Sequence, residues 1–147
     1  MSQPNLPDED HFVRYVPWQR VRKDADDNVI GILGEAFRRR EIDGGLSVNW
    51  LERANPDPQR QLAATVAIFL STMTVGKKAR VAVANVGRFK AICSEHGTRV
   101  RVVHAPEPDN EPHSEIRQLP RDDIELLEIL AVDAVLEHFR CHDLVDC

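Results

Sequence analysis

The segment Val102–Ile116, with the sequence VVHAPEPDNEPHSEI, constrains the fold more than any other part of the chain. A strand-like run ends at His104, and prolines then follow at positions 106, 108 and 112. Proline fixes the backbone angle φ and lacks an N–H, so neither a helix nor a fully paired strand continues through such a stretch. We therefore predict a strand followed by an ordered turn.

This loop also carries side chains that can do chemistry. His104 comes at the end of the predicted strand, where side chains of α/β sheets commonly project into clefts. Asp109 and Asn110 can accept and donate hydrogen bonds, and His113 can act as a base, an acid or a ligand near neutral pH. We predict His104 and His113 as candidate catalytic residues and Asp109 and Asn110 as candidate ligand-binding residues. Their spacing matches no specific metal signature, and neither a metal nor a cofactor is predicted.

A purely structural interpretation of the same loop stays open. Proline, aspartate and asparagine are the standard residues of turns, and Asp109 with Asn110 suffices to close an Asx turn. In that interpretation His113 forms a hydrogen bond with a backbone carbonyl and has no further role. The sequence does not decide between a turn and a site.

Two further candidates lie upstream, on different predicted strands. Arg14 falls within His11–Val16, and Ser47 within Leu46–Leu51, where apolar residues alternate with polar ones. An arginine from one strand and a serine from another can hold a phosphate or a nucleotide, so both are predicted to bind a ligand. The alternative is that Arg14 pairs with a surface carboxylate and Ser47 faces solvent.

Helix and strand signals alternate irregularly along the chain. Asp57 and Pro58 are typical of a helix start, and that helix is predicted to end near Gly76. The further predicted elements are strands at 80–84 and 99–104 and helices at 87–96 and 122–139. These elements predict an α+β fold: one domain with a small mixed sheet of about four or five strands, covered by two or three helices.

The domain boundaries follow from composition at the two ends. Residues 1–10 contain two prolines and an acidic run and are predicted to be a flexible N-terminal arm, residues 11–140 the single domain, and 141–147 a C-terminal tail. Three cysteines without a CxxC pair favour a reducing compartment. With no secretory signal and no apolar run long enough to span a membrane, we expect a cytoplasmic protein that has no contact with membranes.

Charge is distributed unevenly. Residues 1–103 carry a net charge of +4 and residues 104–147 a net charge of −9, which together give the −5 of the whole chain. The acidic C-terminal part is not expected to contact nucleic acid, because phosphate contacts need lysine and arginine. The sequence contains no GxSxG, HExxH or paired CxxC motif that would identify an enzyme class.

Four segments together resemble a group of small uncharacterised bacterial proteins: VRYVPW, NVIGILGEAF, LSVNWLE and the loop described above. The shared pattern is an early arginine, an AF turn, an LSV strand and a closing P-x-x-N-x-x-H, here with one residue fewer between Pro108 and the asparagine. It spans about residues 11–120. The resemblance implies a bacterial cytoplasmic protein without giving an activity. It singles out five positions, which are Arg14, Phe37, Ser47, Asn110 and His113.

Two functions are compatible with these features. The charge split, an apolar last helix and the absence of a catalytic motif favour a non-catalytic interaction module of a two-protein system, of the defence or toxin–antitoxin type. Such a module would bind a protein partner or form a homo-oligomer. The alternative is a small enzyme or binding protein for a nucleotide or phosphorylated ligand. It would use Arg14, Ser47 and the His104–His113 loop, provided that these groups converge in space.

Overall fold

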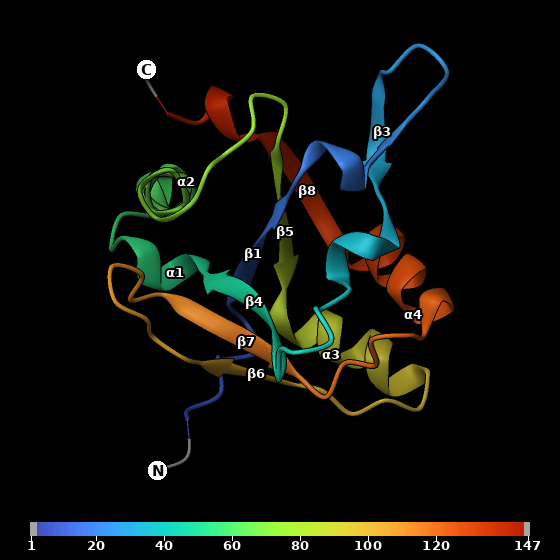
Figure 1. The fold of residues 1–147 in the computed structure, drawn as a ribbon. Coiled ribbons are helices and arrows are strands. Elements are labelled where there is room, and N and C mark those ends of the chain that lie inside the picture. Colours follow the sequence, from blue (N-terminus) through green and yellow to red (C-terminus); the bar gives the residue numbers. More distant parts are fainter. Residues whose placement is uncertain (1–2, 146–147) are drawn as a thin grey trace.

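Six strands form the central sheet of the computed structural model, which describes residues 3–145 (Figure 1). Their order is β6-β7-β4-β1-β5-β8, and every neighbouring pair is antiparallel. The strands are β1 (His11–Val16), β4 (Gly45–Trp50), β5 (Arg80–Asn85), β6 (Arg101–His104), β7 (His113–Arg117) and β8 (Val135–Arg140). A separate ribbon pairs β2 (Val21–Lys23) with β3 (Val29–Ile32). The predicted single α+β domain is confirmed, but the sheet is larger than predicted and antiparallel rather than mixed.

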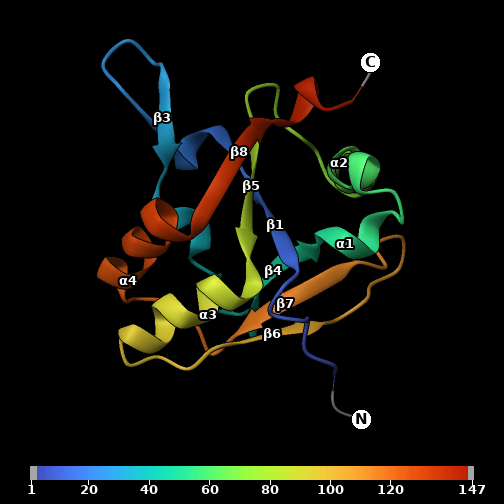
Figure 2. The ribbon, with the colours of Figure 1, turned by 180° about the vertical axis from the view of Figure 1, so that it is seen from behind.

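Helices cover the two faces of the sheet unequally (Figures 1 and 2). α3 (Val86–Glu95) and α4 (Ile124–Ile129) pack on one face, against the larger cluster of buried apolar side chains. α2 (Gln61–Thr72) packs on the other face, against a smaller cluster from β1 and β5. The short α1 (Leu51–Ala54) follows β4 directly. Among the described residues, no buried member of the smaller cluster comes from β4, whose Ser47 is exposed.

Helix ends follow the local signals of the sequence. Asp57 Oδ1 accepts a hydrogen bond from the backbone N–H of Gln59 (3.0 Å), in the 3-10 turn that leads into α2. Gly97, just beyond α3, has a φ of 76°, the left-handed conformation that glycine adopts at helix ends. The start of α4 is capped by Asp123, whose Oδ1 accepts from the N–H of Leu126 (3.1 Å). These signals predict where helices begin better than how long they run.

The long helix predicted over 122–139 is wrong beyond Ala134. α4 ends at Ile129, a π-helical turn spans Leu130–Ala134, and the chain then extends into β8. β8 pairs with β5 from Arg140 opposite Arg80 to Val135 opposite Ala84. β8 takes up the hydrogen-bonding groups along the outer edge of β5. This tertiary pairing overrides the local helical pattern over Val135–Phe139.

Both predicted termini are more ordered than expected in their described parts. Within residues 3–10, predicted as a flexible arm, Pro4 and Leu6 lie along β6, with the Leu6 N–H donating to Val102 O (2.9 Å) and the His104 N–H donating to Pro4 O (2.8 Å). Leu6 itself is buried in the larger cluster. Cys141, predicted to begin a tail, is also fully buried. Leu6 and Cys141 are buried in the core, and their position near the ends of the chain does not predict this. Cys147 lies outside the described residues.

Candidate functional site

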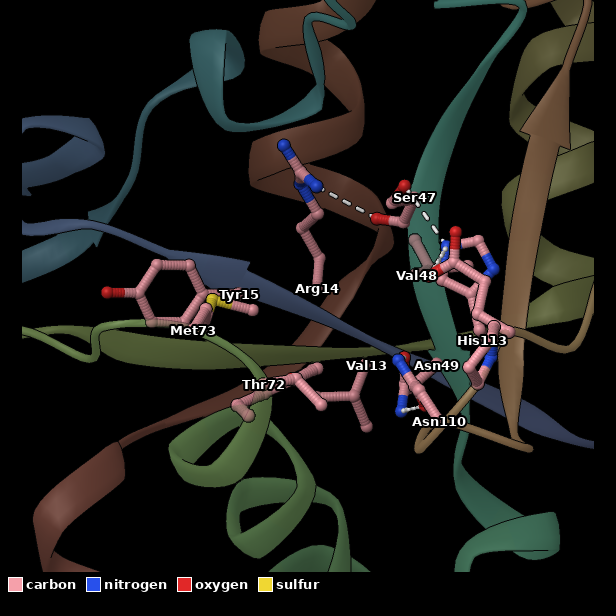
Figure 3. Close-up of a pocket in the computed structure, with 13 residues that line it drawn as sticks. Val13, Arg14, Tyr15, Ser47, Val48, Asn49, Thr72, Met73, Asn110 and His113 are labelled. Atoms are coloured by element: carbon pink, nitrogen blue, oxygen red, sulfur yellow. Dashed lines mark hydrogen bonds and ion pairs between the residues drawn. The ribbon is translucent and has the colours of Figure 1, made fainter.

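A pocket of about 360 Å³ opens between β1, β4, the C-terminal end of α2 and the loop before β7 (Figure 3). Apolar side chains of β1 and α2 form one wall, and polar side chains of β4 and the loop form the other. Four of the six predicted site residues line it: Arg14, Ser47, Asn110 and His113. The condition set by the sequence, that these groups converge, is therefore met in space.

Arg14 lies where the ladder between β1 and β4 ends. The two strands are paired only at Phe12 with Trp50 and at Val13 with Asn49. One residue further along β1, the Nη1 of Arg14 donates to the main-chain oxygen of Ser47 (2.8 Å). Its Nε donates to the carbonyl of Ala36 (2.8 Å), in the 3-10 turn Gly34–Phe37. Two hydrogen bonds thus fix the guanidinium beside Ser47.

These contacts also connect segments singled out from the sequence. The early arginine holds the AF turn through the Ala36 carbonyl and the LSV strand through the Ser47 carbonyl. Phe37, the other residue of the AF turn, is buried with its ring centroid 5.7 Å from that of Phe89. Phe37 therefore has a packing role, whereas Arg14 reaches the pocket.

The charge of Arg14 is poorly compensated. Within residues 3–145 it forms no ion pair with a carboxylate at 4.0 Å or less. Burial, and then the positive charge of Arg20, lower its pKa from 12.5 to about 10, and Asp43 at longer range raises it. Arg14 remains charged at neutral pH, in surroundings that disfavour the charge. An anion in the pocket would relieve that cost.

Ser47 and His113 form a hydrogen-bonded pair. His113 Nδ1 lies 2.7 Å from the carbonyl oxygen of Ala105, which can only accept, so Nδ1 carries the proton. In the neutral ring Nε2 then bears a lone pair, and the Ser47 hydroxyl, 3.2 Å away, donates to it. Figure 3 shows Arg14 and His113 on either side of Ser47. The Ser47 hydroxyl thus has a proton acceptor beside it, while Arg14 binds the main-chain oxygen of the same residue.

The side-chain amides of Asn49 and Asn110 are paired and belong to the polar wall of the pocket. Asn49 Nδ2 donates to Asn110 Oδ1 (2.8 Å), and Asn110 Nδ2 donates to Asn49 Oδ1 (3.2 Å). Both side chains are buried, at 1% and 8% exposure of the residue. Each NH₂ group has a second N–H beyond the one used in this pair. The pair joins the loop to β4 and keeps two donors near the pocket.

Glu107 adds a negative charge at the rim. Its Oε1 is 3.6 Å from His113 Nε2, and its side chain is more than half exposed. This carboxylate can pair with the imidazole when the ring is protonated, and it opposes the binding of an anion nearby. The loop therefore contributes Asn110, which can donate a hydrogen bond to an anion, and Glu107, which repels it.

The structure separates the other two predicted residues from this pocket. His104 Nε2 contacts the main-chain oxygen of Glu111 (2.8 Å), and its ring packs edge-on against Trp50, with 5.3 Å between centroids. Asp109 is an exposed turn residue with a φ of 63°. The structural interpretation of the loop thus describes these two residues. His113 has both of the predicted contacts, a backbone carbonyl and a potential partner side chain.

Sequence reasoning missed Glu107, Thr72 and Met73 as pocket residues. The helix was predicted to reach nearly to Gly76, but α2 ends at Thr72 and Met73 is 41% exposed. The end of a helix is the least certain part of such a prediction, and no local signal identifies these residues as lining a pocket.

No family model, curated protein or solved structure matches the chain. Within residues 3–145, no three His, Cys, Asp or Glu side chains are grouped as metal ligands. Over the same residues, no helix has both the length and the apolar character needed to cross a membrane.

Proposed function

We propose that the pocket binds a phosphorylated ligand, such as a nucleotide or another phosphate ester, and that His113 acts on it as an acid or a base. The observation that carries the proposal is the poorly compensated charge of Arg14, beside a serine hydroxyl and a histidine in one pocket. Guanidinium groups bind phosphate through charge-assisted hydrogen bonds.

The arrangement of donors supports this ligand class. Arg14 uses Nε and Nη1 for main-chain oxygens and forms no hydrogen bond through Nη2 to any described residue. The second N–H groups of Asn49 and Asn110 are further donors for phosphate oxygens. Prolines 108 and 112 restrict the loop, which lowers the entropy lost on binding.

Inorganic phosphate at constant ionic strength is the probe for this function. A ligand that binds only the folded state raises the melting temperature with its concentration. We expect that rise in the wild type and its loss in Arg14→Gln. Arg99→Gln, at an exposed arginine outside the pocket, is the matched control and should behave as the wild type does. An equal rise in all three proteins would mean that phosphate acts only as a general stabilising salt, and the proposal would fail.

A second candidate function is the interaction module of a bacterial, cytoplasmic two-protein system of the defence or toxin–antitoxin type. The observation in its favour is β8, the edge strand of the sheet, beside a groove of about 350 Å³. Ile30, Val132 and Leu136 line the groove and are each more than half exposed. An extended apolar segment of a partner protein could add a strand to β8 and cover these side chains.

Co-expression with the product of the neighbouring gene tests this second candidate. Leu136→Asp should abolish a stable complex on size-exclusion chromatography, whereas Leu70→Asp, at an exposed leucine of α2, should preserve it. A complex that survives Leu136→Asp, or no complex at all, contradicts this function. A dimer of the chain alone that Leu136→Asp dissociates would identify a second copy as the occupant.

A further inference from the structure

We infer that Ser47 is a nucleophile activated by His113, and that the pocket transfers a phosphoryl group from a phosphate monoester through a phosphoserine. This inference rests on the proposed phosphate-binding function and adds a reaction to it. It is carried by the geometry of three groups, which are the Ser47 hydroxyl, the His113 ring and the Ala105 carbonyl.

The three groups form a directed chain of hydrogen bonds. The Ala105 carbonyl, 2.7 Å from Nδ1, fixes the tautomer and orientation of the ring, and Nε2 accepts from the Ser47 hydroxyl at 3.2 Å. A nucleophile next to a base that is itself oriented by a third group is the arrangement that activates serine. Here a main-chain oxygen takes the place that a carboxylate has in other enzymes.

Ser47 and His113 differ in their exposure, as a nucleophile and its base should. Ser47 is exposed at the pocket, whereas His113 is only 6% exposed. The hydroxyl can therefore meet a substrate, while the base is shielded from bulk water. Ser47 also lies within β4, where it is opposite Glu115 of β7, so its main chain is held by the sheet.

The bond between Ser47 and His113 is not needed to hold the loop. Trp50 N–H donates to Pro112 O (2.9 Å), and the pair of Asn49 and Asn110 joins the same two segments. His104 Nε2 adds a third contact, to Glu111 O. Because these bonds already fix the loop, an exposed serine aimed at a histidine adds little stability. Its position is better explained by chemistry.

The reaction balances without any cofactor. Ser47 Oγ bonds to phosphorus as the bond from phosphorus to the ester oxygen breaks, and the hydroxyl proton moves to His113 Nε2 and then to the leaving alkoxide. Water next attacks the phosphoserine, passes a proton to Nε2, and Oγ leaves and recovers that proton. The net reaction converts a phosphate monoester and water into an alcohol and inorganic phosphate. Arg14 offsets the charge of the phosphoryl oxygens throughout.

Labelling with an alkyl fluorophosphonate tests the nucleophile directly, because fluoride leaves without needing a proton. We expect peptide mass spectrometry to find the label on Ser47. Ser47→Ala should abolish labelling, and His113→Asn, whose amide can keep the bond to Ala105, should slow it by at least about a hundredfold. Ser71→Ala removes an exposed hydroxyl of α2 and should leave labelling unchanged. Circular dichroism confirms that each variant is folded.

The outcomes separate this inference from the proposed function. An unlabelled Ser47 in the folded wild type, or equal labelling rates in wild type and His113→Asn, overturns the nucleophile. If phosphate still raises the melting temperature in that case, the binding function stands alone. Labelling of Ser47 in a protein that phosphate does not stabilise would instead contradict the binding function. Turnover of para-nitrophenyl phosphate that is lost in Ser47→Ala would support both.

Discussion

Asn49 and Asn110 lie 61 residues apart and pair their side-chain amides face to face, with donor–acceptor distances of 2.8 and 3.2 Å. Asn49 belongs to β4 and Asn110 to the proline-rich loop. Their hydrogen bonds therefore fix the position of the loop relative to the strand. His113 begins β7 just after the loop and pairs with Asn49 in the sheet. The distance between Ser47 and His113 therefore depends on the pairing of these two asparagines.

Asn110→Ala should destabilise the protein by about 1–3 kcal/mol, because it leaves the buried amide of Asn49 without its partner. Urea unfolding measures this loss. Asn5→Ala is the control: Asn5 is exposed, its side chain accepts only a long 3.4 Å bond from Arg101, and its substitution should change the free energy of unfolding by less than about 0.5 kcal/mol.

A double-mutant cycle sharpens the same prediction. The double variant Asn49→Ala, Asn110→Ala should lose less than the sum of the two single losses, because each single variant already breaks the shared pair. Strictly additive losses would show that the two amides do not stabilise each other.

Gly34→Ala should cost about 1–3 kcal/mol of stability. A Cβ at Gly34 would lie 2.7 Å from the Glu128 nitrogen and 2.8 Å from the Leu127 carbonyl carbon, so α4 would have to move away from the Gly34–Phe37 turn. Thermal unfolding compares it with Gly44→Ala, where the added Cβ meets no heavy atom of the described residues within 4 Å, apart from its chain neighbours, and no loss is expected. Equal melting temperatures would contradict the close packing of α4 on this turn.

Local chemistry predicted the part of the fold that depends on short segments. Asp57 was predicted at a helix start, and it accepts a hydrogen bond from a backbone N–H only two residues away. The strand β8 could not be predicted in this way, because the extended conformation of Val135–Arg140 depends on pairing with β5, which is distant in the sequence. Similarly, β7 begins directly after Pro112, where the prolines obscure the strand signal.

Residue type selected the candidate site residues in the sequence, whereas strand order and register decide which of them reach the pocket. Arg14 and Ser47 were identified because they are polar residues on two different predicted strands, and their meeting depends on β4 lying beside β1. His104 also ends a strand, but β6 lies at the far end of the sheet order from β1, and its side chain turns toward Trp50. The end of a strand can be inferred from a sequence, whereas its neighbour and the face that a side chain takes require the register.

Glu107→Gln should strengthen phosphate binding about fivefold, because it removes a negative charge at the rim of the pocket. A unit charge about 4 Å away contributes roughly 1 kcal/mol in water, which corresponds to that factor. Isothermal titration calorimetry with phosphate measures it, and Glu95→Gln, at an exposed glutamate of α3, should not change the affinity. Weaker binding in Glu107→Gln would mean that this carboxylate helps to hold the ligand.

Stability should fall as the pH rises above 9, because burial raises the pKa of the Cys93 thiol from 9.0 to about 12. Below pH 9 both states keep this proton; above it the unfolded chain loses the proton first, which favours unfolding by up to about 1.4 kcal/mol per pH unit. Urea unfolding at pH 8 and 10.5 should therefore show a smaller decline in Cys93→Ala than in the wild type. Cys141, whose pKa burial raises to about 11, and Arg14, whose lowered pKa acts in the opposite direction, contribute equally to both proteins and cancel. Identical declines would show that the thiol is not buried.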